Sequence, residues 1–193
     1  MSKTYKVVTV SGSVQSPSRT LALIAQLVNT LGDAVPIEVQ QIELGALAPL
    51  IGSALSRAQL PPAAEASIQA IESADVLIVA SPVYRGSYTG LFKHLFDFVH
   101  HEALIDVPVL LAATGGSERH SLVIDHQLRP LFSFFQARTL PIGVYATEQD
   151  FSNYEVTSVP LLERIRLAIE RAVPLLDRAP MLEAQAAPTP VAA

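Results

Sequence analysis

Residues 5–31 read YKVVTVSGSVQSPSRTLALIAQLVNTL and contain the clearest structural pattern in the chain. Its first part, residues 5–10, is a short apolar run that is typical of a strand covered on both faces. Its last part, residues 20–31, places Leu, Ile and Val at helical spacing. A hydroxyl-rich loop, residues 11–20, joins the two. The stretch therefore predicts the first strand–loop–helix unit of an α/β fold.

The same alternation continues along the chain. Residues 46–61 show no clear period and predict a loop with a short helix. Five strand–helix alternations predict a doubly wound α/β sheet of five parallel strands with helices on both faces. The carboxyl ends of parallel strands share one edge, where such folds bind ligands. Further strands are expected at residues 37–42, 75–81, 107–113 and 139–145, and further helices at 62–73, 90–99, 120–137 and 160–176.

Length and composition limit the possible functions. The 193 residues fit one domain, which we place at residues 1–176, followed by a Pro/Ala-rich tail at 177–193. The tail predicts disorder unless a neighbouring subunit holds it. The net charge of −5 argues against a nucleic-acid partner, and the absence of cysteine excludes disulfides and thiolate chemistry. No apolar run is long enough to span a bilayer, so we expect a cytoplasmic protein without a membrane partner.

The loop after the first strand has the chemistry of a phosphate site. Its hydroxyls and its cation come from Ser11, Ser13, Ser18, Arg19 and Thr20. A helix that starts here adds free backbone N–H groups and the positive end of its dipole. The loop lacks the Gly-Lys-Ser/Thr ending of a Walker loop and the three glycines of a dinucleotide fingerprint. The alternative interpretation is a turn of small residues in which Ser18 only caps the helix.

Two further loops follow predicted strands. They offer flat apolar side chains on which a planar ring could lie, and glycines at which the backbone could approach a ligand closely. Paired glycines let the main chain approach a ligand without a Cβ in the way. Each loop alone is equally consistent with an ordinary tight turn. Together with the phosphate loop, they predict a site for a mononucleotide flavin at one sheet edge. The first of them contains Pro82, Val83, Tyr84, Arg85 and Gly86, and the second contains Thr114, Gly115 and Gly116.

These three loops, in this order, resemble those of the NADPH-dependent FMN reductase family, in its branch for bacterial sulfonate use. The resemblance covers roughly residues 6–176. It implies a flavodoxin-like fold, FMN binding, and flavin reduction by NADH or NADPH. It also implies release of reduced flavin to a two-component sulfonate monooxygenase, and a homodimer or homotetramer. The residues carried over as FMN ligands are those named above in the three loops.

Three of the five histidines bear on function, and one of them is a candidate site residue. Related alkanesulfonate reductases carry a tyrosine at an inserted, π-bulged position in the fourth helix, and this chain has His126 there. Pro130 also favours irregularity in that helix. We expect His126 at a subunit interface, where it either influences flavin transfer or is only a polar interface residue. His100 and His101 are neighbours and predict no metal site.

The chain shows no catalytic triad and no carboxylate pair. Hydride transfer between nicotinamide and flavin needs none, because the protein mainly positions the two rings. We therefore expect cofactor-positioning residues and no single catalytic side chain. Two alternatives remain: a quinone or azo reductase that retains FMN, and a non-catalytic electron carrier of the flavodoxin type. The mild net charge of the chain argues against the interpretation as an electron carrier.

Overall fold

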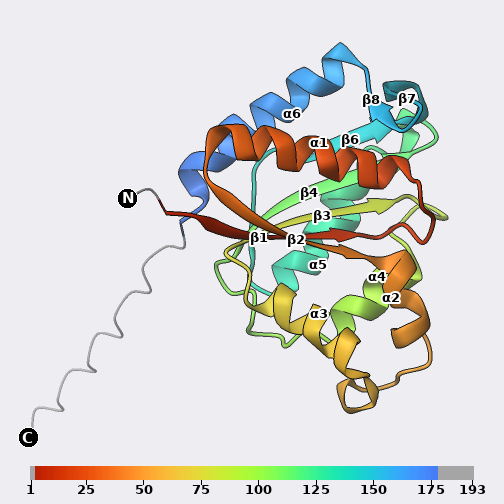
Figure 1. Ribbon diagram of the computed structural model, residues 1–193. Helices are drawn as coiled ribbons and strands as arrows, with labels where there is room; N and C mark the ends of the chain where they lie inside the picture. Colours follow the sequence, from red (N-terminus) through yellow and green to blue (C-terminus); the bar gives the residue numbers. More distant parts are fainter. Residues whose placement is uncertain (1–2, 178–193) are drawn as a thin grey trace, which may run out of the picture.

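The computed structural model describes residues 3–177, and its core is a parallel sheet (Figure 1). The strand order is β2-β1-β3-β4, with β5 and β6 both paired to β4. All of these pairs are parallel. This order is that of flavodoxin-like folds, so the predicted fold class is confirmed. The strands are β1 (Tyr5–Ser11), β2 (Ile37–Glu43), β3 (Val76–Pro82), β4 (Pro108–Gly115), β5 (Arg138–Thr139) and β6 (Val144–Thr147).

The fifth strand position is filled by two short strands, whereas the sequence predicted one strand at residues 139–145. Pro141 lies between β5 and β6, and proline has no N–H to donate to a sheet ladder. The N–H of Leu140 still donates to the carbonyl of Val109 at 2.9 Å, so the hydrogen bonding to β4 is interrupted only after Leu140. The split is therefore a local effect of proline.

Helices cover both faces of the sheet, as predicted (Figure 1). Alternate strand residues face opposite layers: Val7 and Ile78 pack with α1 and α6, and Val8 and Val79 pack with the other helices. This two-sided burial explains why the central strands are almost continuously apolar. One face carries α1 (Arg19–Ala34) and α6 (Val159–Ala172); the other carries α2 (Leu44–Ile51), α3 (Pro62–Glu72), α4 (Gly90–Asp97) and α5 (Arg129–Phe134).

The single helix predicted at residues 120–137 is wrong in detail. The chain forms a 3-10 turn at Glu118–His120, a π-helix at Ile124–Leu128, and then α5. The N–H of Arg129 donates to the carbonyl of Ile124, five residues back. Pro130 follows and cannot donate, so the regular α-helical ladder cannot run through this point. The irregularity expected around His126 and Pro130 is therefore present.

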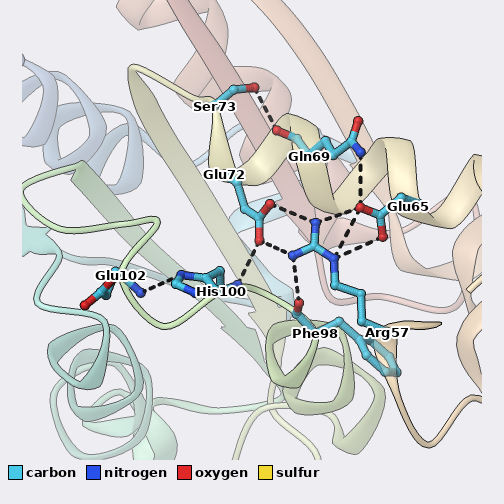
Figure 2. Close-up of polar contacts among 8 residues, drawn as sticks. All are labelled: Arg57, Glu65, Gln69, Glu72, Ser73, Phe98, His100 and Glu102. Atoms are coloured by element: carbon cyan, nitrogen blue, oxygen red, sulfur yellow. Dashed lines mark hydrogen bonds and ion pairs between the residues drawn. The ribbon is translucent and has the colours of Figure 1, made fainter.

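An ion-pair network holds the segment between α2 and α3 against the end of α4 (Figure 2). Arg57 lies 2.7 Å from a carboxylate oxygen of Glu65 and 2.5 Å from one of Glu72. It also donates to the carbonyl of Phe98, and Glu72 accepts the backbone N–H of His100. The hydrogen bonds from Arg57 lower the pKa of Glu65. The network therefore links the connection between β2 and β3, which contains Arg57 and α3, to the end of α4 in the next strand–helix unit.

A small hairpin precedes α6 and was not predicted. It consists of β7 (Phe151–Ser152) and β8 (Glu155–Val156), joined by Asn153 and Tyr154. Both turn residues have positive φ, at 46° and 61°, the left-handed region in which asparagine is tolerated. The hairpin carries the Tyr154 side chain to the carboxyl edge of the main sheet, where it lines the cavity described below.

The described part of the tail is Asp177, which anchors the chain end to β1. Its carboxylate accepts from Lys3 at 3.1 Å and from the hydroxyl of Tyr5 at 3.2 Å. The rest of the predicted tail lies outside the described residues, and the boundary at residue 176 stays a prediction. Within residues 3–177, no helix has both the length and the apolar character needed to cross a membrane.

Candidate functional site

The three predicted loops meet at the carboxyl edge of the sheet. The parallel register sets Pro82 beside Thr114, and Gly115 beside Thr147. A cavity of about 240 Å³ opens between the loops. Its walls come from four strand ends and the β7–β8 hairpin. The lining residues are Ser13, Gln15, Pro17, Ser18, Arg19, Thr20, Pro82, Val83, Tyr84, Thr114, Gly115, Gly116, Glu148 and Tyr154.

The first loop brings the N-terminus of α1 to the cavity. The Ser18 hydroxyl oxygen accepts the N–H of Leu21 at 3.1 Å, so Ser18 is the helix N-cap, and its hydroxyl hydrogen can still point outward. Within residues 3–177, the backbone N–H groups of Arg19 and Thr20 have no internal acceptor. Two free donors at the positive end of a helix dipole favour an anion.

Buried contacts fix this loop against its neighbours. The hydroxyls of Thr20 and Thr114 lie 2.8 Å apart and join the first loop to the glycine loop. Thr89, the N-cap of α4, donates its hydroxyl to the carbonyl of Gly12. A Cβ at Gly12 would lie 2.9 Å from the Ser81 hydroxyl, so a larger residue here would separate β1 from β3. The three loops are thus one connected unit.

The loop after β3 is a tight turn that presents Tyr84. Tyr84 and Ser87 exchange two backbone hydrogen bonds, of 2.8 and 3.1 Å. Between them, Arg85 and Gly86 both have positive φ, at 52° and 83°, as a two-residue turn of this kind requires. The Ser87 hydroxyl donates to the side-chain oxygen of Gln127 at 3.1 Å, which links the turn to the π-helix.

The loop after β4 depends on a close contact with Tyr145. The Tyr145 hydroxyl donates to the carbonyl of Ser117 at 2.6 Å. A Cβ at Gly115 would lie only 2.1 Å from that hydroxyl oxygen, so Gly115 is required by the contact. Burial, and secondarily the charge of Glu118, raise the pKa of Tyr145. The phenol therefore stays protonated and keeps its hydrogen bond. Gly116, by contrast, faces open space.

The structure places most of the predicted ligands on the cavity wall. Ser11 lies beneath the loop, fully buried, and its hydroxyl oxygen accepts the N–H of Ser13 at 3.4 Å. Arg85 and Gly86 form the outer tip of the turn and do not line the cavity. The role of each residue as an FMN ligand stays a prediction. The predicted residues on the wall are Ser13, Ser18, Arg19, Thr20, Pro82, Val83, Tyr84, Thr114, Gly115 and Gly116.

Four lining residues were not among the predicted ligands. Gln15 and Pro17 lie inside the first loop and lacked a distinctive pattern. Glu148 directly follows β6, so the rule that strand ends carry the site applies to it as well. Tyr154 reaches the cavity only because the β7–β8 hairpin folds over α1, and no local sequence signal indicates this.

Arg19 and Glu148 are the single cation and the single carboxylate on the wall as described. Arg19 Nη1 lies 2.9 Å from Glu148 Oε1, and both side chains are about half exposed, at 45% and 57%. The wall therefore has one compensated positive charge together with the free backbone N–H groups of Arg19 and Thr20. This combination favours an anion at the start of α1.

His126 lies exposed on the π-helix and does not line the cavity. Its neighbour Gln127 provides the connection to the turn after β3. A role of His126 in an interface or in flavin transfer stays a prediction.

His100 and His101 lie beyond the end of α4, in an exposed turn. Their ring nitrogens and the carboxylate of Glu102 lie within 4.8 Å of one another. His100 Nδ1 accepts the N–H of Glu102 at 3.3 Å, which occupies one of its two ligand atoms. The three groups are exposed and adjacent in sequence, and the expectation that they hold no metal stays a prediction.

Comparison with known proteins decides the family. A model of the family described as NADPH-dependent FMN reductase matches residues 5–152. The chain belongs to the NADPH-dependent FMN reductase family. The match includes all three loops and Glu148 but ends before Tyr154. FMN and a nicotinamide dinucleotide are accordingly the cofactors of this FMN reductase.

Relatives of this FMN reductase include both NADH-dependent and NADPH-dependent enzymes. It is 66% identical to the NADH-dependent FMN reductase SfnF of Pseudomonas fluorescens (strain Pf0-1), over 91% of this chain and 94% of the relative. It is 62% identical to an FMN reductase (NADPH) of Pseudomonas aeruginosa, over the same shares. The solved apo structure of the NADH:FMN oxidoreductase EmoB matches with a TM-score of 0.77 at 29% identity, covering 88% of this chain and 89% of that one.

Proposed function

We propose that this protein is an NAD(P)H-dependent FMN reductase that supplies reduced flavin to a two-component sulfonate monooxygenase. The observation that carries the proposal is a single cavity lined both by the N-terminus of α1, with its free N–H groups, and by the loops after β3 and β4. Family membership supports the FMN chemistry. The relatives named SfnF and SfnE, together with the sulfonate-branch resemblance of the loops, support the partner class.

The residues of the site would bind and orient the flavin. Arg19 and the N–H groups at the start of α1 would hold the phosphate, and Val83, Tyr84 and Gly116 would border the ring. Bound FMN supplies the hydride acceptor. No lining group is placed as a proton donor of the histidine or carboxylic acid type other than Glu148, which is paired with Arg19. This fits a reaction that depends on ring alignment and not on acid–base catalysis.

Self-association is part of the proposal. A second cavity of about 530 Å³ lies between α4 and α5, and its wall includes Leu131, Phe134 and Phe135. Phe134 is 66% exposed beside this cavity, whose wall combines aromatic and aliphatic residues with Lys93, Asp97, His100 and His101. A second copy of the chain packed here would cover Phe134, in a homodimer or homotetramer.

The cytoplasmic location likewise stays a prediction.

Steady-state kinetics with purified protein test the proposal. NADH or NADPH oxidation under air should rise with added free FMN and saturate at a FMN concentration far above that of the enzyme. Oxidation that needs only one tightly bound FMN per chain and an added quinone would instead indicate a retained cofactor. No oxidation with either nicotinamide, despite FMN binding, would indicate an electron carrier. Running both nicotinamides in parallel establishes the hydride donor.

A further inference from the structure

We infer that Glu148 competes with the FMN phosphate for Arg19 and thereby weakens flavin binding enough for the flavin to leave. This inference rests on the proposed function and adds a residue that sets the exchange rate. Its starting point is that the two side chains form an ion pair of 2.9 Å on the wall of the same cavity.

The backbone of Glu148 is held in place by its own turn, so its side chain starts from a fixed position beside Arg19. The preceding residue, Thr147, pairs with Gly115 in the sheet. The N–H and the hydroxyl of Thr147 both donate to the Asp150 carboxylate, at 2.7 and 2.8 Å. The carbonyl of Asp150 in turn accepts the N–H of Thr157. The short turn at Glu148–Asp150 is therefore fixed to both the sheet and the segment before α6.

The backbone of Arg19 is fixed in a similar way on the other side of the cavity. Arg19 is the first residue of α1, directly after the N-cap Ser18, and Thr20 next to it is buried against Thr114. The backbone of Arg19 therefore stays at the start of α1, within reach of an anion that binds there. When a phosphate dianion occupies the start of α1, Arg19 faces two anions, and Glu148 repels the phosphate across the same few ångströms.

The consequence is specific to flavins with a phosphate. Backbone donors and hydroxyls attract the phosphate, whereas Glu148 offsets part of the contribution of Arg19. Riboflavin lacks the phosphate and should not respond to Glu148. A reductase that delivers its flavin to another enzyme benefits from such an offset, because faster dissociation shortens the time that reduced flavin stays bound.

Equilibrium binding tests the inference without any turnover. FMN and riboflavin are titrated by quenching of flavin fluorescence, with stopped-flow measurement of FMN dissociation, on wild type and Glu148→Gln. The matched control is Glu163→Gln, which removes the same charge from an exposed position on α6. Thermal melting checks that each variant is folded.

Glu148→Gln should lower the Kd for FMN roughly three- to tenfold, the scale of one exposed ion pair plus the relieved repulsion. FMN should dissociate correspondingly more slowly, and riboflavin binding should stay within about twofold. The control should match wild type. In an Arg19→Ala background the part of the gain that comes from the competition for Arg19 should be lost, and only the part that comes from direct repulsion should remain.

Several results would overturn the inference. These are an equal gain for riboflavin, a full gain in the Arg19→Ala background, an equal gain from Glu163→Gln, or weaker FMN binding. If wild type binds FMN no better than riboflavin, the phosphate assignment itself fails, and this inference with it. A reductase that prefers FMN but is insensitive to Glu148 would leave the proposed function standing and refute only the role of Glu148.

Discussion

Replacing Gly115 with alanine should strain the glycine loop through its contact with Tyr145. The new Cβ would lie 2.1 Å from the Tyr145 hydroxyl oxygen and 3.1 Å from the adjacent ring carbon. Tyr145 cannot simply rotate away without losing its 2.6 Å hydrogen bond to Ser117. Overpacking of this kind costs about 1–3 kcal/mol, and the lost hydrogen bond adds about 1 kcal/mol. We expect Gly115→Ala to lower the free energy of unfolding by about 2–4 kcal/mol.

The partner variant Tyr145→Phe makes the prediction sharper. It removes the hydroxyl but keeps the ring, and the exposed carbonyl of Ser117 can turn to water, so it should cost about 1 kcal/mol or less. In the double variant the 2.1 Å clash no longer exists and only the 3.1 Å ring contact remains. The double variant should therefore be more stable than Gly115→Ala alone, by about 1–2 kcal/mol.

Urea denaturation at 25 °C measures these differences, with an unchanged m value confirming a comparable unfolding transition. FMN titration of the same proteins reports whether the loop still fits the flavin, and Gly115→Ala should bind FMN more weakly than Tyr145→Phe. Losses of stability that simply add, within about 0.5 kcal/mol, would refute the reasoning, because independent sites are additive and clashing ones are not.

Three other outcomes are expected. Arg19→Ala should weaken FMN binding by about 1–2.5 kcal/mol, which is the contribution of a charged hydrogen bond minus that of the exposed ion pair that Arg19 gives up. Riboflavin binding should stay unchanged in fluorescence titration, and equal losses for both flavins would contradict the phosphate assignment. Arg57→Met should destabilise the fold at pH 7, and its cost in urea denaturation should fall below about pH 4.5. The reason is that Arg57 lowers the pKa of Glu65. The stabilisation of the fold by this pair is therefore present above the ordinary pKa of glutamate and is lost as pH falls through the lowered pKa. A destabilisation by Arg57→Met that stays constant with pH would refute this. Gly143→Ala should displace the π-helix, because its Cβ would lie 2.5 Å from Ile124, and a melting temperature equal to that of wild type would contradict this.

The parts of the site that could be predicted are those that depend on the pattern of residues within a short stretch of sequence. Ser18 and Arg19 mark a strand-to-helix junction, and any such junction in a parallel sheet lies at the ligand edge. The glycines of the loop after β4 were recognisable in the same way. The connection between these loops was not, since the hydrogen bond between Thr20 and Thr114 joins residues 94 positions apart. Such a pairing depends on strand register, which the local sequence does not specify.

The errors have equally local causes. The helix expected at residues 120–137 has the right apolar spacing, but Pro130 and the π-helix change which backbone groups can pair. The fifth strand is interrupted at Pro141 for the same reason. In both places proline removes a donor, and the surrounding packing decides how the chain adapts to the loss.

The parallel sheet, its helical layers and the order of the three ligand loops could be predicted from the sequence, because apolar periodicity and turn chemistry act over a few residues. The contact between Glu148 and Arg19 could not, and it became visible only in the folded chain. The same holds for Tyr145, which occupies the space a side chain at Gly115 would need. Both contacts require strands that are distant in the chain to be aligned within about an ångström. That alignment comes from packing of the whole sheet between its two helical layers.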